Sequence, residues 1–351
     1  MNYVSAAEFQ ISCIPSKWAV CFYATTVVLI FYILITLHIY HQYHDNYLNT
    51  IFTPDLYQQI NSRNHGYNLL IPHPSSSILF IIAHPDDEVL FFAPTLRYLK
   101  NTYEHLKKMP LFNQTFFQFQ GYDNYNIYIL CLTSGDYYGL GEIRKQELIA
   151  SCQTLGIPSS RIVILNFADD PNVRYDSWHL YNTLQNYTDQ FFTNNFHQRQ
   201  INETYSQYIF TFDNYGVSGH LNHKSIFSGL RHFTEPHNFY NKSRMLFEIY
   251  TLQSINIIRK YLSIFDLPIS YYSSRDSKNL IIISDLEQYT LSVRSFLNHV
   301  TQLRWFRYLY IVFSRYMCIN IWSNYNTSIN HRHKHKQFLF FNYTYESNVE
   351  L

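Results

Sequence analysis

A histidine and three acidic residues lie close together in the motif HPDDE at positions 84–88. The motif follows an apolar run and stands where a helix would begin, because Pro85 suits the first helical turn. An acid-rich helix start that complements the helix dipole would account for Asp86, Asp87 and the glutamate after them. It would not account for His84, whose imidazole contributes nothing at a helix N-terminus. A metal site is therefore the other interpretation of this segment.

A second motif, GHLNH at positions 219–223, also follows an apolar run and leads into a helix. His220 and His223 are three residues apart, so at a helix start they share a face and can point into one cleft. The chain has 17 histidines, and the alternative is that these two are ordinary core or surface side chains. Their position at a second strand-to-helix corner favours a site shared with the first motif.

Together the two motifs contain the groups that metal-dependent hydrolysis of an amide requires. Two imidazoles and one carboxylate can hold Zn²⁺ and leave a position for water. The metal lowers the pKa of that water and polarises a carbonyl. A second carboxylate can act as general base, and a further histidine can stabilise the oxyanion. Nitrogen and oxygen ligands would also suit Fe²⁺ or Mn²⁺. The five side chains for these roles are His84, Asp86, Asp87, His220 and His223.

For the two motifs to share one site, each must follow a strand, and the two strands must end side by side. The apolar runs of the chain predict such strands. The runs are continuous rather than alternating, which is typical of strands buried on both faces of a parallel sheet. Helices are expected between them, notably at residues 142–155 and 222–233. This alternation predicts a doubly wound, Rossmann-like α/β fold with a mostly parallel sheet and ligands at the carboxyl ends of its strands. Strands are expected at residues 78–83, 127–132, 162–165, 208–212, 245–250 and 280–283.

A membrane segment precedes this domain. Residues 18–40 contain no Asp, Glu, Lys or Arg, and Trp18 and Tyr40 stand at the two ends. As a helix the segment can cross a hydrocarbon core of about 30 Å. A secretory signal peptide is the alternative, but the run is too long, only Lys17 precedes it as a cation, and no small-residue cleavage pattern follows. We therefore expect one transmembrane helix after a tail at residues 1–17.

The remainder divides into a linker at 41–76, a catalytic domain at 77–320 and a polar tail at 321–351. A short accessory helix is the alternative for residues 45–74. The last part of the domain, residues 302–316, mixes arginines with large aromatic side chains. It is either an amphipathic helix on a membrane surface or a helix packed on the core with its arginines extending outward. The run HRHKHK at 331–336 is interpreted as a solvated tail and not as a metal site.

Charge and cysteine content exclude other classes. A net charge of +1 gives no basic surface for a nucleic-acid partner. The five cysteines are odd in number and none has CxxC spacing, which argues against a disulfide framework and against a thiolate zinc site. No protein partner can be deduced from the sequence.

Three longer blocks surround the motifs, and shorter matches at 251–261 and 305–316 extend the pattern almost to residue 320. With these blocks the chain resembles the LmbE-like family of zinc-dependent de-N-acetylases. Within that family it resembles the eukaryotic N-acetylglucosaminyl-phosphatidylinositol de-N-acetylases of GPI-anchor synthesis. The blocks are IAHPDDE with FFAP at 82–88 and 91–94, SGDYYGLGEIRKQEL at 134–148, and TFD leading to GVSGHLNH at 211–223.

The resemblance implies a role for each residue of the two motifs. His84, Asp87 and His223 would be the metal ligands. Asp86 would be the general base. His220 would stabilise the tetrahedral intermediate or protonate the leaving amine.

The resemblance also implies residues that contact the substrate. Arg144 would do so, or would instead form a buried salt bridge with Glu147. Asp169 or Asp170 would bind a sugar hydroxyl, and Asp170 is the one we expect. Asn222 stands where bacterial members often have Asp, which matches the eukaryotic branch.

The implied reaction is hydrolysis of the N-acetyl group of N-acetylglucosaminyl-phosphatidylinositol, a glycolipid that must be met at a membrane. The implied location is the endoplasmic reticulum membrane, with a single span and a cytosolic catalytic domain. Lys17 slightly favours the opposite orientation. Glycosylation triplets such as those at Asn186 and Asn202 could suggest a lumenal domain, although a chain this rich in Asn and Thr generates them by chance. The alternatives are a de-N-acetylase of another N-acetyl sugar and a catalytically inactive membrane adaptor.

Overall fold

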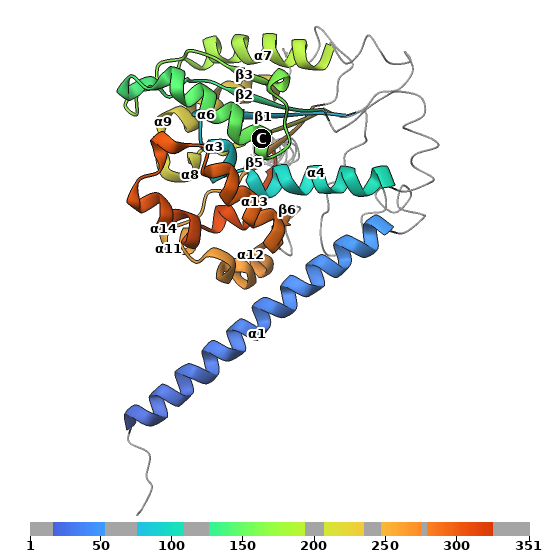
Figure 1. Cartoon of the computed structure of the whole chain (residues 1–351), viewed down its shortest axis with the longest axis vertical. Helices are drawn as coiled ribbons and strands as arrows, with labels where there is room; N and C mark the ends of the chain where they lie inside the picture. The colour runs from blue at the N-terminus through green and yellow to red at the C-terminus, as the bar shows by residue number, and fades with distance from the viewer. Residues whose placement is uncertain are drawn as a thin grey trace, which may run out of the picture.

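The computed structural model describes residues 17–52, 76–108, 126–193, 207–234, 247–274 and 279–325. They form a long N-terminal helix and one α/β domain (Figure 1). Residues 1–16 of the tail expected at 1–17, and the histidine-rich run at 331–336, lie outside the described residues.

A seven-stranded sheet forms the centre of the domain, in the order β3-β2-β1-β4-β5-β7-β6. β1 pairs in parallel with β2 and with β4, so Phe80 lies between Ile129 and Phe210. All six residues of β1 are buried, as its continuous apolar run predicts. The doubly wound, mostly parallel α/β fold is therefore confirmed. The strands are β1 (Ser77–Ile82), β2 (Asn126–Cys131), β3 (Ile162–Ile164), β4 (Gln207–Phe212), β5 (Phe247–Leu252), β6 (Leu280–Ile283) and β7 (Ile319–Asn324).

Helices cover both faces of this sheet. α7 packs against α9, and both contact β1, while α13 packs against α4 and α6. Figure 1 shows α7 on one side of the strands and α4 with α13 on the other. The helices expected at 142–155 and 222–233 correspond to α6 and α9. The α-helices of the domain are α3 (Asp87–Leu90), α4 (Ala93–Lys108), α6 (Gly141–Thr154), α7 (Ser177–Thr193), α8 (Gly216–Gly219), α9 (Leu221–Leu230), α11 (Ile257–Lys260), α12 (Leu267–Ser274), α13 (Leu286–Phe296) and α14 (Trp305–Phe313). The 3-10 helices are η2 (Asp136–Tyr138), η3 (Ser159–Arg161), η4 (Arg231–Thr234), η5 (Ser263–Asp266), η6 (Val300–Gln302) and η7 (Arg315–Met317).

The strand β7 is not among those that the sequence predicts. It pairs in antiparallel orientation with both β5 and β6, and its Trp322 is fully buried against Phe92. The boundary expected at residue 320 falls inside this strand, so the domain continues through Asn324. β7 was not predicted because it contains polar residues, whose hydrogen bonds are made inside the fold. Buried Asn320, for example, donates from Nδ2 to the carbonyl oxygen of Phe91 and accepts from Thr95 Oγ1.

The N-terminal helix α1 (Lys17–Phe52) contains the expected span and continues beyond it. Within the described part of the chain, its residues Cys21–Tyr47 are the one helical segment long and apolar enough to cross a membrane. Residues 41–52 continue this helix and are not a linker, whereas residues 53–75 of the segment expected as a linker or short accessory helix lie outside the described chain. The C-terminal half of α1 packs on the domain through buried Ile39, Tyr43 and Tyr47. Figure 1 shows the N-terminal half projecting away from the domain.

Candidate active site

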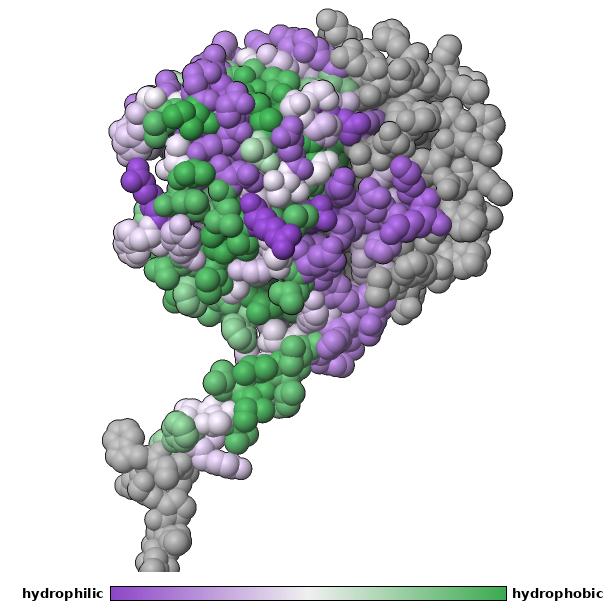
Figure 2. Space-filling view, viewed as in Figure 1, coloured by the Kyte–Doolittle hydropathy of each residue, from purple (hydrophilic) through white to green (hydrophobic). Residues whose placement is uncertain are grey.

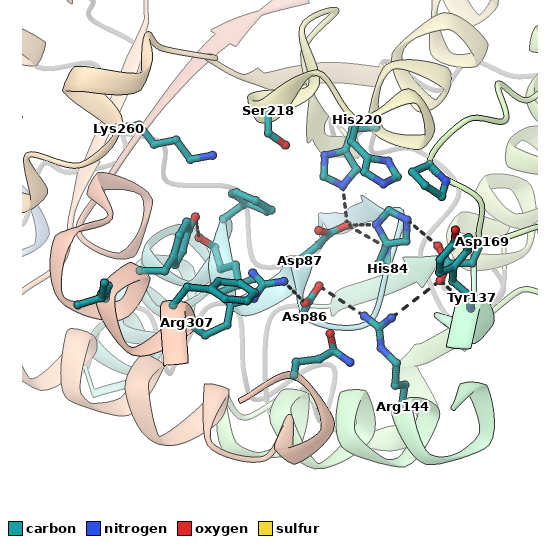
Figure 3. A pocket seen from close by; sticks show the side chains of 18 of the residues that line it. His84, Asp86, Asp87, Tyr137, Arg144, Asp169, Ser218, His220, Lys260 and Arg307 are labelled. Carbon is teal, nitrogen blue, oxygen red and sulfur yellow. Dashed lines mark hydrogen bonds and ion pairs between the residues drawn. The ribbon is translucent and has the colours of Figure 1, made fainter. Parts of the chain in front are cut away.

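The two motifs lie at the carboxyl ends of neighbouring strands. His84 follows β1, and the GHLNH histidines follow β4 after a turn and α8. Strand order reverses between β1 and β4, which is where a doubly wound sheet opens a crevice for ligands. A cavity of about 720 Å³ occupies this position (Figure 3). It is lined by all five predicted side chains, His84, Asp86, Asp87, His220 and His223.

The turn after β1 holds Asp86 at a φ of 130°, which non-glycine residues rarely adopt. The buried side chain of Glu88 stabilises this turn. Its Oε2 accepts the Asp86 N–H at 3.1 Å, and its Oε1 accepts from His299 Nε2 at 2.6 Å and from Ser151 Oγ at 2.5 Å. Such backbone strain costs about 1–3 kcal/mol and persists where the surroundings over-determine it. The last acid of HPDDE therefore builds the turn that presents Asp86.

The corner after β4 depends on Asp213 and a glycine. Asp213 Oδ1 accepts the N–H groups of Tyr215 and Gly216 at 3.0 Å each. Gly216 has a φ of +62°, and a Cβ there would lie 2.7 Å from His223 Cβ. A glycine is thus required both for the backbone conformation and for the close approach of His223.

Asp87 lies at the centre of the site. Its Oδ2 accepts the backbone N–H groups of Ala83 and His84 at 3.0 and 2.9 Å. The same oxygen is 3.3 Å from His223 Nε2 and 3.7 Å from His84 Nδ1. Burial alone would raise the pKa of Asp87, but His223 and His84 outweigh burial and hold this pKa well below its usual range.

Hydrogen bonds fix which nitrogen each histidine turns toward Asp87. His84 Nε2 lies 3.2 Å from Asp169 Oδ1, and His223 Nδ1 donates to the carbonyl oxygen of Gly216 at 3.1 Å. In the neutral rings, His84 Nδ1 and His223 Nε2 therefore face Asp87 with their lone pairs available. Burial alone would lower the pKa of His84, but Asp169 and Asp87 outweigh burial and raise it to about 9.

His220 has the opposite arrangement. Its Nδ1 accepts the Asn222 N–H at 3.3 Å, so in the neutral ring the proton is on Nε2. Burial, followed by the charges of His84 and His223, lowers the pKa of His220 to about 4. A neutral imidazole with an N–H to offer suits a donor to an oxyanion.

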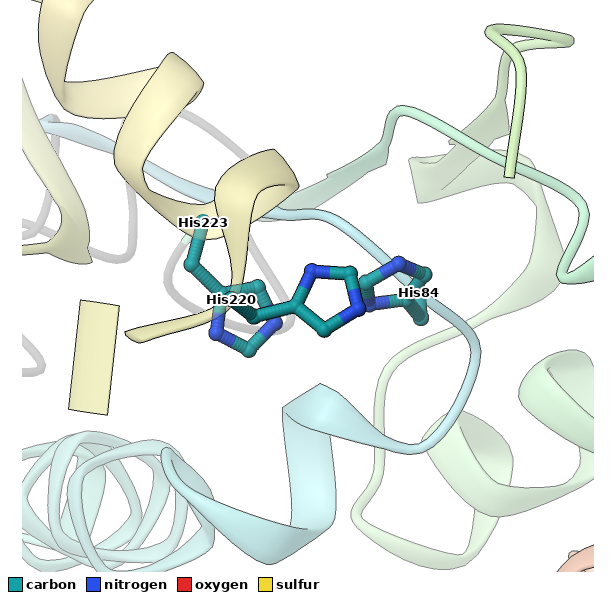
Figure 4. A group of neighbouring side chains, drawn as sticks. All are labelled: His84, His220 and His223. Carbon is teal, nitrogen blue, oxygen red and sulfur yellow. The ribbon is translucent and has the colours of Figure 1, made fainter. Parts of the chain in front are cut away.

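The donor set fits a divalent metal ion. Ligand atoms of His84, His220 and His223 all lie within 4.8 Å of one another (Figure 4). Two ligands of a tetrahedral zinc site are separated by roughly 3.4 Å, given bonds of about 2.0–2.1 Å. The distances from Asp87 Oδ2 to the two histidine nitrogens, 3.3 and 3.7 Å, are close to that separation. His223 Nε2 is also a buried nitrogen that makes no hydrogen bond to the described residues.

Asp86 lies beside the cluster and is oriented by two arginines. Its Oδ2 accepts from Arg307 Nη2 at 3.1 Å, and its Oδ1 is 3.8 Å from Arg144 Nη2. In Figure 3, Asp86 and His220 lie on opposite sides of Asp87. The predicted base and the predicted oxyanion donor thus flank the predicted ligands.

Arg144 forms no salt bridge with Glu147, so that alternative is wrong. Its Nη2 donates to the carbonyl oxygen of Pro85 at 2.6 Å, and its Nη1 donates to that of Gly135 at 3.1 Å. Glu147 instead accepts the N–H and hydroxyl of Thr301. Arg144 therefore joins the loop after β2 to the turn that carries Asp86, and it lines the cavity.

Comparison with known proteins identifies the family. Residues 79–234, which include both motifs, match the family model described as GlcNAc-PI de-N-acetylase. The N-acetylglucosaminyl-phosphatidylinositol de-N-acetylase of Bos taurus is 35% identical over 253 residues, covering 71% of this chain and 84% of that protein. The chain belongs to the GlcNAc-PI de-N-acetylase family. A probable N-acetylglucosaminyl-phosphatidylinositol de-N-acetylase of Dictyostelium discoideum is 29% identical, covering 69% of this chain and 91% of that protein. Among solved structures, the N,N'-diacetylchitobiose deacetylase of Pyrococcus horikoshii is similar with a TM-score of 0.42 and 17% identity, covering 67% of this chain and 75% of that one.

Asn222 and Asp169 together orient His84 in this member of the GlcNAc-PI de-N-acetylase family. With its Nδ2 donating to the carbonyl oxygen of Val173 at 3.0 Å, Asn222 Oδ1 accepts from His84 Nε2 at 3.1 Å. Asp169 lines the cavity, whereas Asp170 Oδ1 accepts the N–H of Asn172 and does not line it. The contact between Asp170 and a sugar hydroxyl stays a prediction, and Asp169 is the better placed of the two.

Two functional side chains are missing from the sequence prediction. One of the two interpretations of residues 302–316 has its arginines extending outward, whereas Arg307 reaches inward to Asp86. His299, fully buried beside Glu88, was not singled out at all. An isolated cation inside the apolar run WFRYLYIVF is the one signal that could have drawn attention to Arg307.

Proposed function

We propose that this chain hydrolyses the acetamide of N-acetylglucosaminyl-phosphatidylinositol, releasing acetate and leaving glucosaminyl-phosphatidylinositol. The observation that carries the proposal is the placement of Asp86 and His220 on either side of Asp87 in one cavity, in a member of this family. The reaction is an early step of GPI-anchor biosynthesis.

His84, Asp87 and His223 would hold the metal, with Zn²⁺ as the first choice and Fe²⁺ or Mn²⁺ also compatible with two nitrogens and one oxygen. When bound, the metal polarises the amide carbonyl and makes water acidic enough to attack it at neutral pH. Asp169 and the carbonyl oxygen of Gly216 would keep the two imidazoles correctly turned for this role.

Asp86 would act as the general base in the proposed reaction. Its carboxylate takes one proton from the water as the oxygen adds to the carbonyl carbon. The Nε2–H of neutral His220 donates a hydrogen bond to the oxygen that becomes negative, and the leaving nitrogen takes the proton that Asp86 received from the water. The C–N bond then breaks, the nitrogen leaves as an amine with the transferred proton, and the acyl group leaves as acetate.

Arg144 would contact the substrate as well as the Asp86 turn, since it lines the cavity. A lipid-linked substrate is favoured over a soluble N-acetyl sugar by two features. The chain has an apolar helix able to span a membrane, and aromatic side chains of α14 line the cavity.

We further propose that α1 anchors the enzyme as a single span in the endoplasmic reticulum membrane, with the catalytic domain in the cytosol. Protease protection and endoglycosidase treatment of microsomes test this orientation. We expect the domain to be digested without detergent and to carry no glycans. A glycan on Asn186 would place it in the lumen instead.

The reaction is tested with the full chain in lipid vesicles, by measuring acetate release from the glycolipid and from soluble N-acetylglucosamine conjugates. We expect turnover of the glycolipid and far slower turnover of the conjugates. Equal or preferential turnover of the conjugates would identify a different de-N-acetylase, and no turnover of either would support an inactive adaptor.

A further inference from the structure

The helices α11 and α14 at the cavity mouth, and η5 and α12 beside α11, expose large apolar side chains. Ile258 of α11 is 75% exposed and Trp305 of α14 is 76% exposed. On the segment formed by η5 and α12, Phe265, Ile269 and Tyr272 are all exposed, and their spacing of four and three residues puts them on one helical face. We call the exposed apolar side chains of α11, η5, α12 and α14 the mouth surface.

The polar and apolar faces of α14 are reversed relative to those of a helix at an aqueous surface. Its Arg307 reaches inward to Asp86, while Trp305, Leu309 and Val312, at helical spacing, are exposed. An amphipathic helix at an aqueous surface has its polar face outward. The inversion indicates an apolar environment on the outer side of α14.

The mouth surface is continuous with the apolar part of α1. Tyr261, directly after α11, contacts Tyr310 of α14. α11 contacts η5, and both η5 and α12 contact α1. The Tyr32 hydroxyl of α1 donates to the carbonyl oxygen of Phe265 at 2.5 Å. Figure 2 shows apolar residues on the lower part of the domain and along the adjoining segment of α1.

The length of α1 implies that the mouth surface enters the membrane when α1 spans it. The sixteen residues from Lys17 to Tyr32 rise about 24 Å, which is less than the hydrocarbon thickness of about 30 Å. A full span therefore has to continue past Tyr32 to about Leu37, which is exposed on α1. The carbonyl oxygen of Phe265 accepts a hydrogen bond from Tyr32. When α1 spans the bilayer, η5 and its neighbours therefore lie within the depth of the bilayer.

Charge agrees with this placement. Within residues 257–274 and 305–313 the only carboxylate is Asp266, and it is fully buried. Lys260 lines the cavity mouth, with its Nζ about 6 Å from the Tyr261 and Tyr310 rings. A surface with cations and without exposed carboxylates is compatible with the phosphate layer of a membrane.

We propose that the mouth surface is a membrane-docking surface that inserts into the same leaflet as residues 32–37 of α1, so that the cavity opens at the level of the lipid headgroups. The occupant of this surface is the lipid bilayer. The proposal goes beyond the reaction proposed above, because membrane contact at these helices holds whatever the substrate is.

The test uses lipids with brominated acyl chains, which quench tryptophan only at short range. The full chain is placed in nanodiscs of brominated or ordinary phosphatidylcholine, as wild type, Trp305→Phe and Trp178→Phe. Trp178 is the matched control, since it is 51% exposed but lies on α7, on the other side of the sheet.

We expect the emission removed by Trp305→Phe to be strongly quenched by brominated lipid, and the emission removed by Trp178→Phe to be unquenched. Adding Val312→Trp to the Trp305→Phe chain should restore the quenched emission. Unquenched emission from both Trp305 and the new tryptophan would overturn the proposal and indicate a water-exposed or protein-covered surface. Neither result depends on turnover. The proposed reaction can therefore be refuted while membrane docking is supported, and membrane docking can be refuted while the reaction is supported.

Discussion

Replacing Glu88 by Gln tests whether the last acid of HPDDE is a structural part of the site. Both Glu88 and His299 are fully buried, and Glu88 Oε1 is 2.6 Å from His299 Nε2. The substitution keeps the shape of the side chain but removes its charge. It therefore leaves the buried imidazole of His299 without its counterion.

Removing one partner of a buried ion pair costs about 3–5 kcal/mol. The amide retains part of the hydrogen bonding to Ser151 and to the Asp86 N–H, so we expect about 3 kcal/mol for Glu88→Gln. For a domain of this size 1 kcal/mol lowers the unfolding midpoint by roughly 2–4 °C, which predicts a decrease of about 6–12 °C.

The effect should depend on pH with a defined sign. Burial alone would lower the pKa of His299, but the charge and hydrogen bond of Glu88 outweigh burial and raise it. A raised pKa in the folded state means that the pair stabilises fully below the ordinary histidine pKa of about 6.5. Its contribution is lost as the pH rises through the folded-state pKa. The difference in midpoint between wild type and Glu88→Gln should therefore be largest in mild acid and should shrink in alkali.

Thermal unfolding of the full chain in detergent, at one scan rate and a series of pH values, measures this difference. Glu142→Gln is the control, because that carboxylate is exposed and, among the described residues, forms an ion pair with Lys145 alone. A decrease below about 2 °C for Glu88→Gln, within the range expected for a surface change, would refute the reasoning. So would a difference that does not change with pH.

Three further predictions concern a buried ion pair and two cations that line the cavity. Asp266→Ala removes the carboxylate 3.1 Å from the fully buried guanidinium of Arg315, and we expect a loss of about 3–5 kcal/mol, measured as a lower unfolding midpoint. Arg307→Met removes a charged hydrogen bond to Asp86 and should lower kcat by about tenfold or more, measured as acetate release. Lys260→Met should raise KM for the glycolipid more than KM for a conjugate lacking phosphate, and an equal rise for both would exclude a phosphate contact.

The fold and the chemical centre of the site could be predicted because their signals are local. The continuous apolar run of β1 indicates a buried parallel strand, and His84 directly after it has no structural reason to be there. His220 and His223 repeat that arrangement after β4. Parallel strands end at one edge, so two short motifs suffice to bring these side chains together.

Other features depend on contacts between distant residues and could not be predicted. Arg307 lies 221 positions from Asp86, and nothing in its own helix says that it turns inward. The choice between Asp169 and Asp170 is set by how the loop after β3 approaches His84. β7 contains Asn320, which is polar in the sequence but is satisfied by buried partners.

Asp86 is proposed above as the general base of a metal-dependent de-N-acetylase. The most direct measurement compares acetate release from the glycolipid by wild type, Asp86→Asn and the control Glu142→Gln, each with its metal content determined. We predict that Asp86→Asn loses about 10²–10⁴-fold in kcat, as expected for a general base, while it retains its metal because the ligands are untouched. A chelator should abolish turnover by the wild type. Turnover by Asp86→Asn at the rate of Glu142→Gln would contradict the account.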